Sequence, residues 1–253
     1  MQRYFLKLSY NGKPFHGWQS QPNAVSVQST IETALSTVLR CETPITGAGR
    51  TDTGVNARVM YAHFDSSPIE DKNRFLLSLN RLCGPDIALE DLIATHDEAH
   101  ARFDATEREY KYFVTFEKSP FLAPFSWHSP SPLDMDAMNE AAELLKKTKD
   151  FTSFAKLHSD AKTNICDLRE ARWEFWENAY GTNGIVFTIR ADRFLRNMVR
   201  AVVGTLVDVG RGKLSPSAFQ DIIDARDRCS AGTSMPPQAL FLWNIKYPFI
   251  HES

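Results

Sequence analysis

The chain has 253 residues, 43% of them hydrophobic and 24% charged, with 29 Lys and Arg against 31 Asp and Glu. This balance excludes a disordered or collagen-like chain, and the length suffices for a core that needs no disulfide or metal. The net charge of −2 disfavours a protein that coats nucleic acid nonspecifically, whereas a local basic cleft remains compatible with it.

The cysteines lie far apart, at Cys41, Cys83, Cys166 and Cys229, so no pair has the spacing of a zinc knuckle or a C-x-x-C redox motif. The first residues have no charged segment followed by a long apolar run, so no signal peptide is indicated. No stretch approaches the roughly 18 apolar residues that cross a bilayer. We therefore expect free thiols, a cytoplasmic protein and no membrane partner.

Alternating and helical patterns follow one another through the first part of the chain. Strands are predicted at 4–10, 43–46, 59–65 and 87–95. Helices are predicted at 26–40, with Ser26 as N-cap, and at 71–82, with an apolar side made of Phe75, Leu76, Leu79 and Leu82.

A strand is predicted at 109–116, followed by the proline-rich segment 119–133, which indicates a linker or a long crossing loop. A second set of elements comprises helices at 136–147, 195–209 and 215–225 and strands at 164–176, 185–191 and 239–247. Strands mixed with helices in both parts favour an α+β fold of two similar units over a doubly wound parallel sheet. We assign the units to residues 1–105 and 106–253.

The densest motif spans residues 47–57, which read GAGRTDTGVNA. It lacks the Lys-Ser/Thr of a Walker motif and the spacing of a dinucleotide-binding motif. One interpretation is a glycine-rich turn with a surface ion pair. The other is a ligand site, because glycines permit close approach of a ligand, and a cation near Asp52 would keep its carboxylate ionised and available as a nucleophile.

Tyr110 and Tyr112 share a face of the strand predicted at 109–116. Two such tyrosines are most often core residues, but an aromatic face can also stack on an unpaired base. Spacing alone leaves both interpretations open.

Residues 190–213 hold six basic side chains against two acidic ones in a chain that is negative overall. Arg196 and Arg200 are four apart, which predicts that they share a helix face. This face is either solvated or a phosphate-binding edge with one arginine turned inward to pair with a carboxylate.

The segment from His96 to His100 contains metal-ligating residue types, but it is not H-E-x-x-H, and it falls between two predicted strands. We predict no metal site there. No Ser-His-Asp arrangement stands out in the sequence.

Several motifs together resemble the TruA family of tRNA pseudouridine synthases. Residues 49–57 are similar to the family pattern G-R-T-D-x-G-V-H-A, with Asn56 in the usual histidine position. Further similar segments follow in the family's order: Tyr10 to Gln19, His100 to Phe103, Arg108 to Tyr112, Asp150 to Phe154, Phe194 to Arg200 and Leu240 to Pro248.

The resemblance implies isomerisation of uridine to pseudouridine at positions 38–40 of the tRNA anticodon arm, with no cofactor, metal or DNA. It implies that Asp52 is the nucleophile, that Arg50 helps to extrude the base, that Tyr110 stacks on the base and that Arg200 pairs with Asp52. It also implies a homodimer, and a fold of two α+β halves whose antiparallel sheets join into one extended sheet with a central cleft.

Two alternatives remain at this stage. One is a noncatalytic RNA-binding or RNA-chaperone protein with the same fold. Asn56 is the only feature of the motifs that favours it. The other is a carboxylate hydrolase acting on a nucleotide or sugar, which needs a second acid or base that the sequence does not offer.

Overall fold

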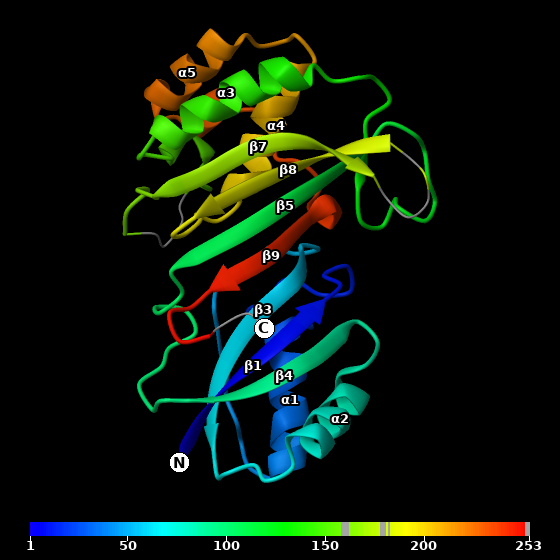
Figure 1. Ribbon diagram of the computed structural model, residues 1–253, viewed down its shortest axis with the longest axis vertical. Coiled ribbons are helices and arrows are strands. Elements are labelled where there is room, and N and C mark those ends of the chain that lie inside the picture. Colours follow the sequence, from blue (N-terminus) through cyan, green and yellow to red (C-terminus); the bar gives the residue numbers. More distant parts are fainter. Residues whose placement is uncertain (158–161, 178–180, 182, 251–253) are drawn as a thin grey trace. The chain divides into compact units, whose positions relative to one another are not determined.

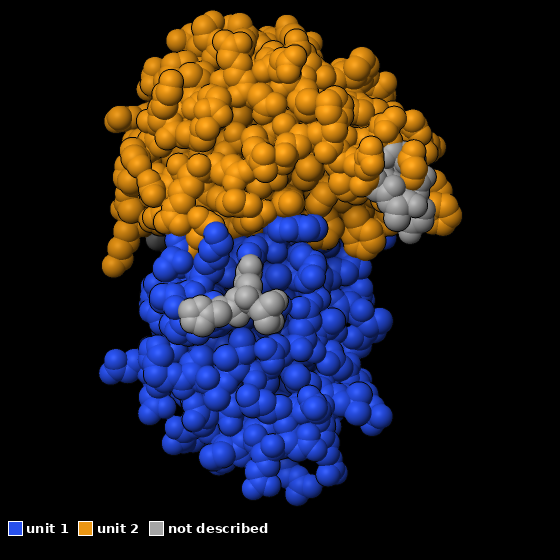
Figure 2. Space-filling view, viewed as in Figure 1, with its two compact units in different colours: residues 1–106, 242–253 blue, residues 107–241 orange. Residues whose placement is uncertain are grey.

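The computed structural model describes residues 1–157, 162–177, 181 and 183–250 (Figure 1). This part of the chain is a mixed α/β protein with nine β-strands and five α-helices. It divides into two compact units, coloured separately in Figure 2. The first unit comprises Met1–Thr106 and Leu242–Ser253, and the second comprises Glu107–Phe241.

The first unit contains a sheet with the strand order β4-β1-β3-β9, in which β4, β1 and β3 are antiparallel and the short β2 pairs antiparallel with β3. Its strands are β1 (Gln2–Tyr10), β2 (Thr46–Gly47), β3 (Asn56–Ser66), β4 (Ile87–Thr95) and β9 (Leu240–Lys246). The helices α1 (Val27–Leu39) and α2 (Lys72–Cys83) lie behind β1 and β4 in Figure 1. Ser26 and Asp71 cap them, each accepting a backbone N–H of the first helical turn.

Alternation along β1 gives this sheet two buried faces. Leu6 and Leu8 pair with Ala62 and Met60 on β3, and all four side chains are fully buried. Burial of each large side chain contributes about 1.5–3 kcal/mol, so this layer makes a major contribution to the stability of the unit.

Residues after β9 cover part of the other face of the first unit. Phe249 and Tyr247 contact the Phe5 ring edge-on, at centroid distances of 5.5 and 5.3 Å. Tyr247 also packs edge-on against Tyr61, and its hydroxyl donates a hydrogen bond to the carbonyl of Ala101. Segments from opposite ends of the sequence therefore share one core.

The second unit contains the antiparallel strand order β5-β8-β7, with β6 paired in parallel to β5. Its strands are β5 (Glu107–Thr115), β6 (Trp127–His128), β7 (Leu168–Glu177) and β8 (Asn183–Ala191). Its helices are α3 (Met135–Lys147), α4 (Met198–Gly210) and α5 (Pro216–Ala225), and short 3₁₀ turns occur at Thr152–Phe154, Arg228–Ser230 and Pro237–Ala239.

The two faces of the second sheet differ in chemistry. Tyr112, Phe187 and Trp173 occupy neighbouring positions across β5, β8 and β7 and are buried. On the other face Arg190 bridges Glu109 and Glu170 at 2.9 and 2.8 Å. The apolar face carries the core, and the opposite face is held by ion pairs across the strands.

Most predicted elements are confirmed, with boundary shifts of one to four residues at most ends. The expected apolar side of α2 is partly wrong, because Leu82 is 50% exposed and the buried residue of the last turn is Cys83. The two-residue β6, within the proline-rich segment, was not expected.

The predicted mixture of strands and helices is confirmed. The prediction of two similar halves around a central cleft stays a prediction. Within the described residues, no helix has the length and hydropathy of a membrane span.

Candidate active site

Asp52 lies in the loop that joins β2 to β3, and it begins a tight turn. The backbone N–H of Val55 donates to the carbonyl of Asp52 at 3.1 Å. Gly54, the third residue of this turn, has φ +77°, a conformation that glycine adopts without strain. Asp52 itself is half-buried, and Arg50 is exposed. The turn thus presents a partly accessible carboxylate beside an exposed guanidinium in the same loop.

Thr51, the residue before Asp52, is fixed through its side chain and its backbone. Its hydroxyl is 2.8 Å from the hydroxyl of Tyr10, and its carbonyl accepts the backbone N–H of Trp18 at 3.3 Å. Thr51 is only 8% exposed. These bonds hold the entry to the Asp52 turn against β1 and the segment that follows it.

Asn56, the first residue of β3, fixes the exit from the same turn. Its side chain is 1% exposed, and its Oδ1 accepts the backbone N–H of Gly12 at 2.9 Å. Asn56 stands where the resembled family pattern has a histidine. In the structure the amide is an internal hydrogen-bond acceptor.

Glycines allow the segments around the Asp52 turn to pack closely. A Cβ on Gly12 would lie 2.1 Å from the carbonyl oxygen of Val55, and one on Gly47 would lie 2.4 Å from the ring of Trp18. Gly17 has φ +90°, and a Cβ there would lie 2.5 Å from the carbonyl oxygen of Thr51. Gly49 differs, because a Cβ there would meet nothing within 4 Å. Most of these glycines are therefore needed for packing within the unit.

Tyr110 and Tyr112 on β5 have different environments. Tyr110 is half-buried, and its ring packs edge-to-face on Phe194 with centroids 5.1 Å apart. Tyr112 is fully buried, and its hydroxyl donates to the carbonyl of Pro236 at 3.2 Å. Burial raises the pKa of Tyr112, and the positive charge of Arg200 acts in the opposite direction. Tyr112 is therefore a core residue.

Arg200 lies in the first turn of α4 and is held by Met235. Its Nε donates to the Met235 carbonyl at 2.6 Å, and the Met235 N–H donates to the Arg200 carbonyl at 3.1 Å. The expectation that Arg196 shares its helix face is wrong, because α4 begins only at Met198. Asn197 has φ +64°, a left-handed conformation that cannot continue a right-handed helix, so Arg196 lies in the preceding turn.

A small polar network supports the segment that carries Met235. The hydroxyl of Ser234 accepts the Asn197 amide at 2.6 Å and the Arg228 guanidinium at 2.9 Å. Sequence reasoning did not identify Ser234 or Arg228, because the network joins residues that are distant in sequence. The only signal for Asn197 was its place within the motif ending at Arg200.

The predicted site residues thus fall into two groups. Arg50 and Asp52 share one loop of the first unit. In the second unit, Tyr110 lies on β5 and Arg200 on α4, and the Met235–Pro236 segment bonds to both Arg200 and Tyr112.

The histidines of the segment 96–100 have structural neighbours. His100 packs against His63, with ring centroids 4.7 Å apart, and His96 against Phe249 at 5.2 Å. In the described part of the chain, no three His, Cys, Asp or Glu side chains gather in a way that could hold a metal ion.

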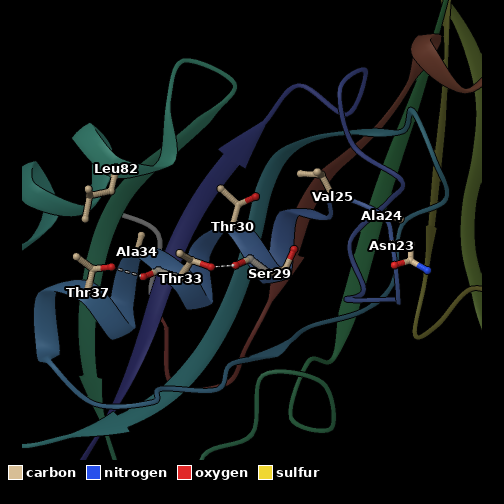
Figure 3. A pocket seen from close by; sticks show the side chains of 9 residues that line it. All are labelled: Asn23, Ala24, Val25, Ser29, Thr30, Thr33, Ala34, Thr37 and Leu82. Atoms are coloured by element: carbon tan, nitrogen blue, oxygen red, sulfur yellow. Dashed lines mark hydrogen bonds between the residues drawn. The ribbon is translucent and has the colours of Figure 1, made fainter.

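A cavity of about 540 Å³ lies along α1, and none of the predicted site residues lines it (Figure 3). The hydroxyls of Thr30, Thr33 and Thr37 each donate to a carbonyl one turn earlier in the chain. These hydroxyl groups therefore donate to backbone carbonyls and not into the cavity. The cavity lacks the convergent polar groups that are typical of a ligand-binding site.

The chain is similar to known proteins over nearly its full length, and to one family model over part of it. A family model described as tRNA pseudouridine synthase matches residues 141–248. A protein named tRNA pseudouridine synthase A from Parabacteroides distasonis is 53% identical, over 98% of this chain and 97% of its own length. Its namesake from Bacteroides thetaiotaomicron is 53% identical over 98% and 91%. A third, from Bacillus subtilis, is 37% identical over 95% and 97%.

Proposed function

Since the chain belongs to the family of tRNA pseudouridine synthases, we propose that it isomerises uridine to pseudouridine at positions 38–40 of the tRNA anticodon arm. The observation that carries the proposal is the 53% identity over 98% of the chain. A match that covers 98% of the chain spans both units and the Asp52 loop.

The reaction breaks the C1′–N1 glycosidic bond, turns the uracil and joins its C5 to C1′. No group is added or lost overall, so the reaction needs no redox partner or energy donor. The target base must first leave its stack, which costs a few kcal/mol. Arg50, exposed and two residues before Asp52, is suited to helping extrude the base or to holding the displaced one.

Asp52 is the proposed nucleophile. Its fixed neighbour Thr51 and its own turn limit the positions that the carboxylate can take, and this is how a positioned group lowers a barrier. Attack on the uracil ring, attack on the sugar and removal of a sugar proton all remain chemically open to such a carboxylate.

Tyr110 and Arg200 complete the proposed site from the second unit. Tyr110 stacks on the target base and assists proton movement at C5, and its half-buried ring supports this role. Arg200 keeps Asp52 ionised and oriented, for which a guanidinium anchored at Nε is well suited. The partners are tRNA and a second copy of the chain in a homodimer, and the proposed location is the cytoplasm.

The alternative of a noncatalytic RNA-binding protein loses its main support from the sequence. Asn56 was the feature in its favour, and the bond from the Gly12 N–H to Asn56 Oδ1 gives that residue a structural role. The sequence offers no candidate for the second acid or base that a carboxylate hydrolase needs, and release of free uracil would identify such an enzyme.

The test uses a tRNA transcript with tritium at C5 of its uridines, because C5 loses its hydrogen when the new bond is complete. We expect tritium release by the wild type with or without a chelator, and none by Asp52→Asn. Asp97→Asn, an exposed carboxylate in the same unit, is the matched control and should retain activity. Tight tRNA binding without release by the wild type would instead favour the RNA-binding protein.

A further inference from the structure

We propose that Asn56 is a positioning residue for Asp52, acting as a hydrogen-bond acceptor that ties the Asp52 turn to the segment after β1. The inference rests on the proposed function for its activity measurements. Its structural basis is the contact between Asn56 Oδ1 and the backbone N–H of Gly12, 2.9 Å apart and buried.

The contact lies where the pairing of β1 with β3 ends. Backbone pairing runs from Gln2 opposite Ser66 to Tyr10 opposite Ala57, with an irregularity between Leu8 and Tyr10. Asn56 lies one residue and Gly12 two residues beyond this last pair. Their hydrogen bond has a side-chain oxygen as acceptor, whereas the bonds of a β-ladder have backbone carbonyls. The amide thus extends the connection between the two segments beyond the sheet.

The Asp52 turn is consequently held at both ends. Thr51 is bound to Tyr10 and Trp18 on one side, and Asn56 is bound to Gly12 on the other. Only four residues lie between these two fixed positions. A Cβ on Gly12 would lie 2.1 Å from the Val55 carbonyl oxygen, so the Gly12 backbone lies close to the turn that the Asn56 bond holds.

The identity of the acceptor explains why asparagine can stand where the resemblance places a histidine. Asn Oδ1 and His Nδ1 are both attached to Cγ, so they reach nearly the same point from the same backbone. A neutral histidine accepts at Nδ1 if its proton is on Nε2. The position therefore requires an acceptor at this point, and it requires no acid or base.

Three variants separate positioning from general stability. Asn56→Leu keeps the size and branching of the side chain but removes the acceptor, whereas Asn56→His restores an acceptor. Asn80→Leu is the matched control, because Asn80 Oδ1 accepts the Leu89 N–H at 2.8 Å in the same unit, between α2 and β4. For each variant, kcat and KM are obtained from tritium release with tRNA, and the melting temperature from circular dichroism.

We expect Asn56→Leu to lower kcat about 10- to 100-fold with KM within about twofold, since misplacement by about 1 Å can cost a factor of this size. Asn56→His should stay within about threefold of the wild-type kcat at pH 8. Asn80→Leu should melt earlier and retain the wild-type kcat. If Asn56→Leu does not fold, Asn56→Ala at about 15 °C takes its place, with folding verified by circular dichroism.

A wild-type kcat for Asn56→Leu, or an equal loss for Asn56→His and Asn56→Leu, would overturn the positioning role. An equal loss of kcat in Asn80→Leu would also overturn it, since the effect would then be one of stability. Wild-type protein that releases no tritium from any tRNA would overturn the proposed function itself. The two failures are therefore distinguishable.

Discussion

Tyr110 and Tyr112 lie two residues apart on one face of β5, yet Tyr112 is completely enclosed while Tyr110 keeps part of its ring accessible. The difference follows from their neighbours, because Tyr112 pairs with Phe187 on β8 and bonds to the carbonyl of Pro236. Tyr110 packs edge-on against Phe194, outside the regular strands. One strand therefore supplies a core residue and a candidate contact to the substrate.

The first prediction concerns the accessible ring. We expect Tyr110→Phe to bind tRNA as the wild type does, because the ring that stacks is kept. Its tritium release should fall about 100-fold, since the lost hydroxyl is assigned to proton movement. Single-turnover release and filter binding measure the two properties separately, and unchanged release would remove the hydroxyl from the mechanism.

The second prediction concerns the enclosed ring. Tyr112→Phe leaves the carbonyl of Pro236 without its buried donor, and we expect a loss of about 1–2 kcal/mol in the free energy of unfolding. Its kcat should stay within twofold of the wild type. Urea denaturation and tritium release check both points, and a large loss of kcat without destabilisation would assign Tyr112 to the reaction.

The third prediction compares two glycines of one motif. Gly47→Ala places a Cβ 2.4 Å from the ring of Trp18, and we expect a destabilisation of about 1–3 kcal/mol. Gly49→Ala meets nothing within 4 Å and should be within about 0.5 kcal/mol of the wild type. Thermal or urea unfolding of the pair is the measurement. If Gly49→Ala is stable but binds tRNA poorly, Gly49 is kept for the approach of RNA.

The fourth prediction concerns pH. Burial, aided by the positive charge of Arg3, lowers the pKa of His63 to about 4. Its Nδ1 accepts the Ala101 N–H at 3.0 Å, which only a deprotonated nitrogen can do. Between about pH 6.5 and 4 the unfolded chain binds the extra proton and the folded one does not, so stability falls as the pH drops through this range.

We expect this effect to reach about 2 kcal/mol, measured by urea denaturation at several pH values. His63→Asn keeps an acceptor near the Nδ1 position and removes the titration, so its stability should vary less between pH 6.5 and 4. The lowered pKa values of Asp65 and Asp150 act mainly below about pH 4 and do not mask the result. An equally steep loss in the variant would assign the effect to other groups.

The fifth prediction concerns the anchored guanidinium. In Arg200→Lys a single ammonium cannot hold the Met235 carbonyl and also present the planar fork of an arginine to a carboxylate. We expect kcat to fall about 100-fold with little change in KM. Arg172→Lys, on a partly exposed ion pair of β7, is the control and should have wild-type kinetics. Wild-type kinetics in both variants would separate Arg200 from the reaction.

Local signals predicted much of the fold. The extended pattern at 87–95 matches β4, and Ser26 caps α1 as predicted. The family resemblance is confirmed by relatives that span nearly the whole chain. These successes share a cause, because alternation, caps and motifs all act over a few neighbouring residues.

The failures involve contacts between distant residues. The start of α4 depends on the left-handed Asn197, whose amide bonds to Ser234, and no helical pattern contains that information. The role of Asn56 depends on Gly12, which lies 44 residues away. Sequence analysis could register Asn56 only as a departure, because its bonding partner was not visible there.

The return of the chain to the first unit after Phe241 has a consequence for how the protein is made. Phe5 and Tyr61 are translated before the second unit, whereas the aromatic residues that cover them, Tyr247 and Phe249, follow it along the chain. These rings of the first unit therefore stay uncovered until the whole second unit has been synthesised. Contacts between residues so distant in sequence form slowly, and apolar surface that stays exposed meanwhile favours aggregation.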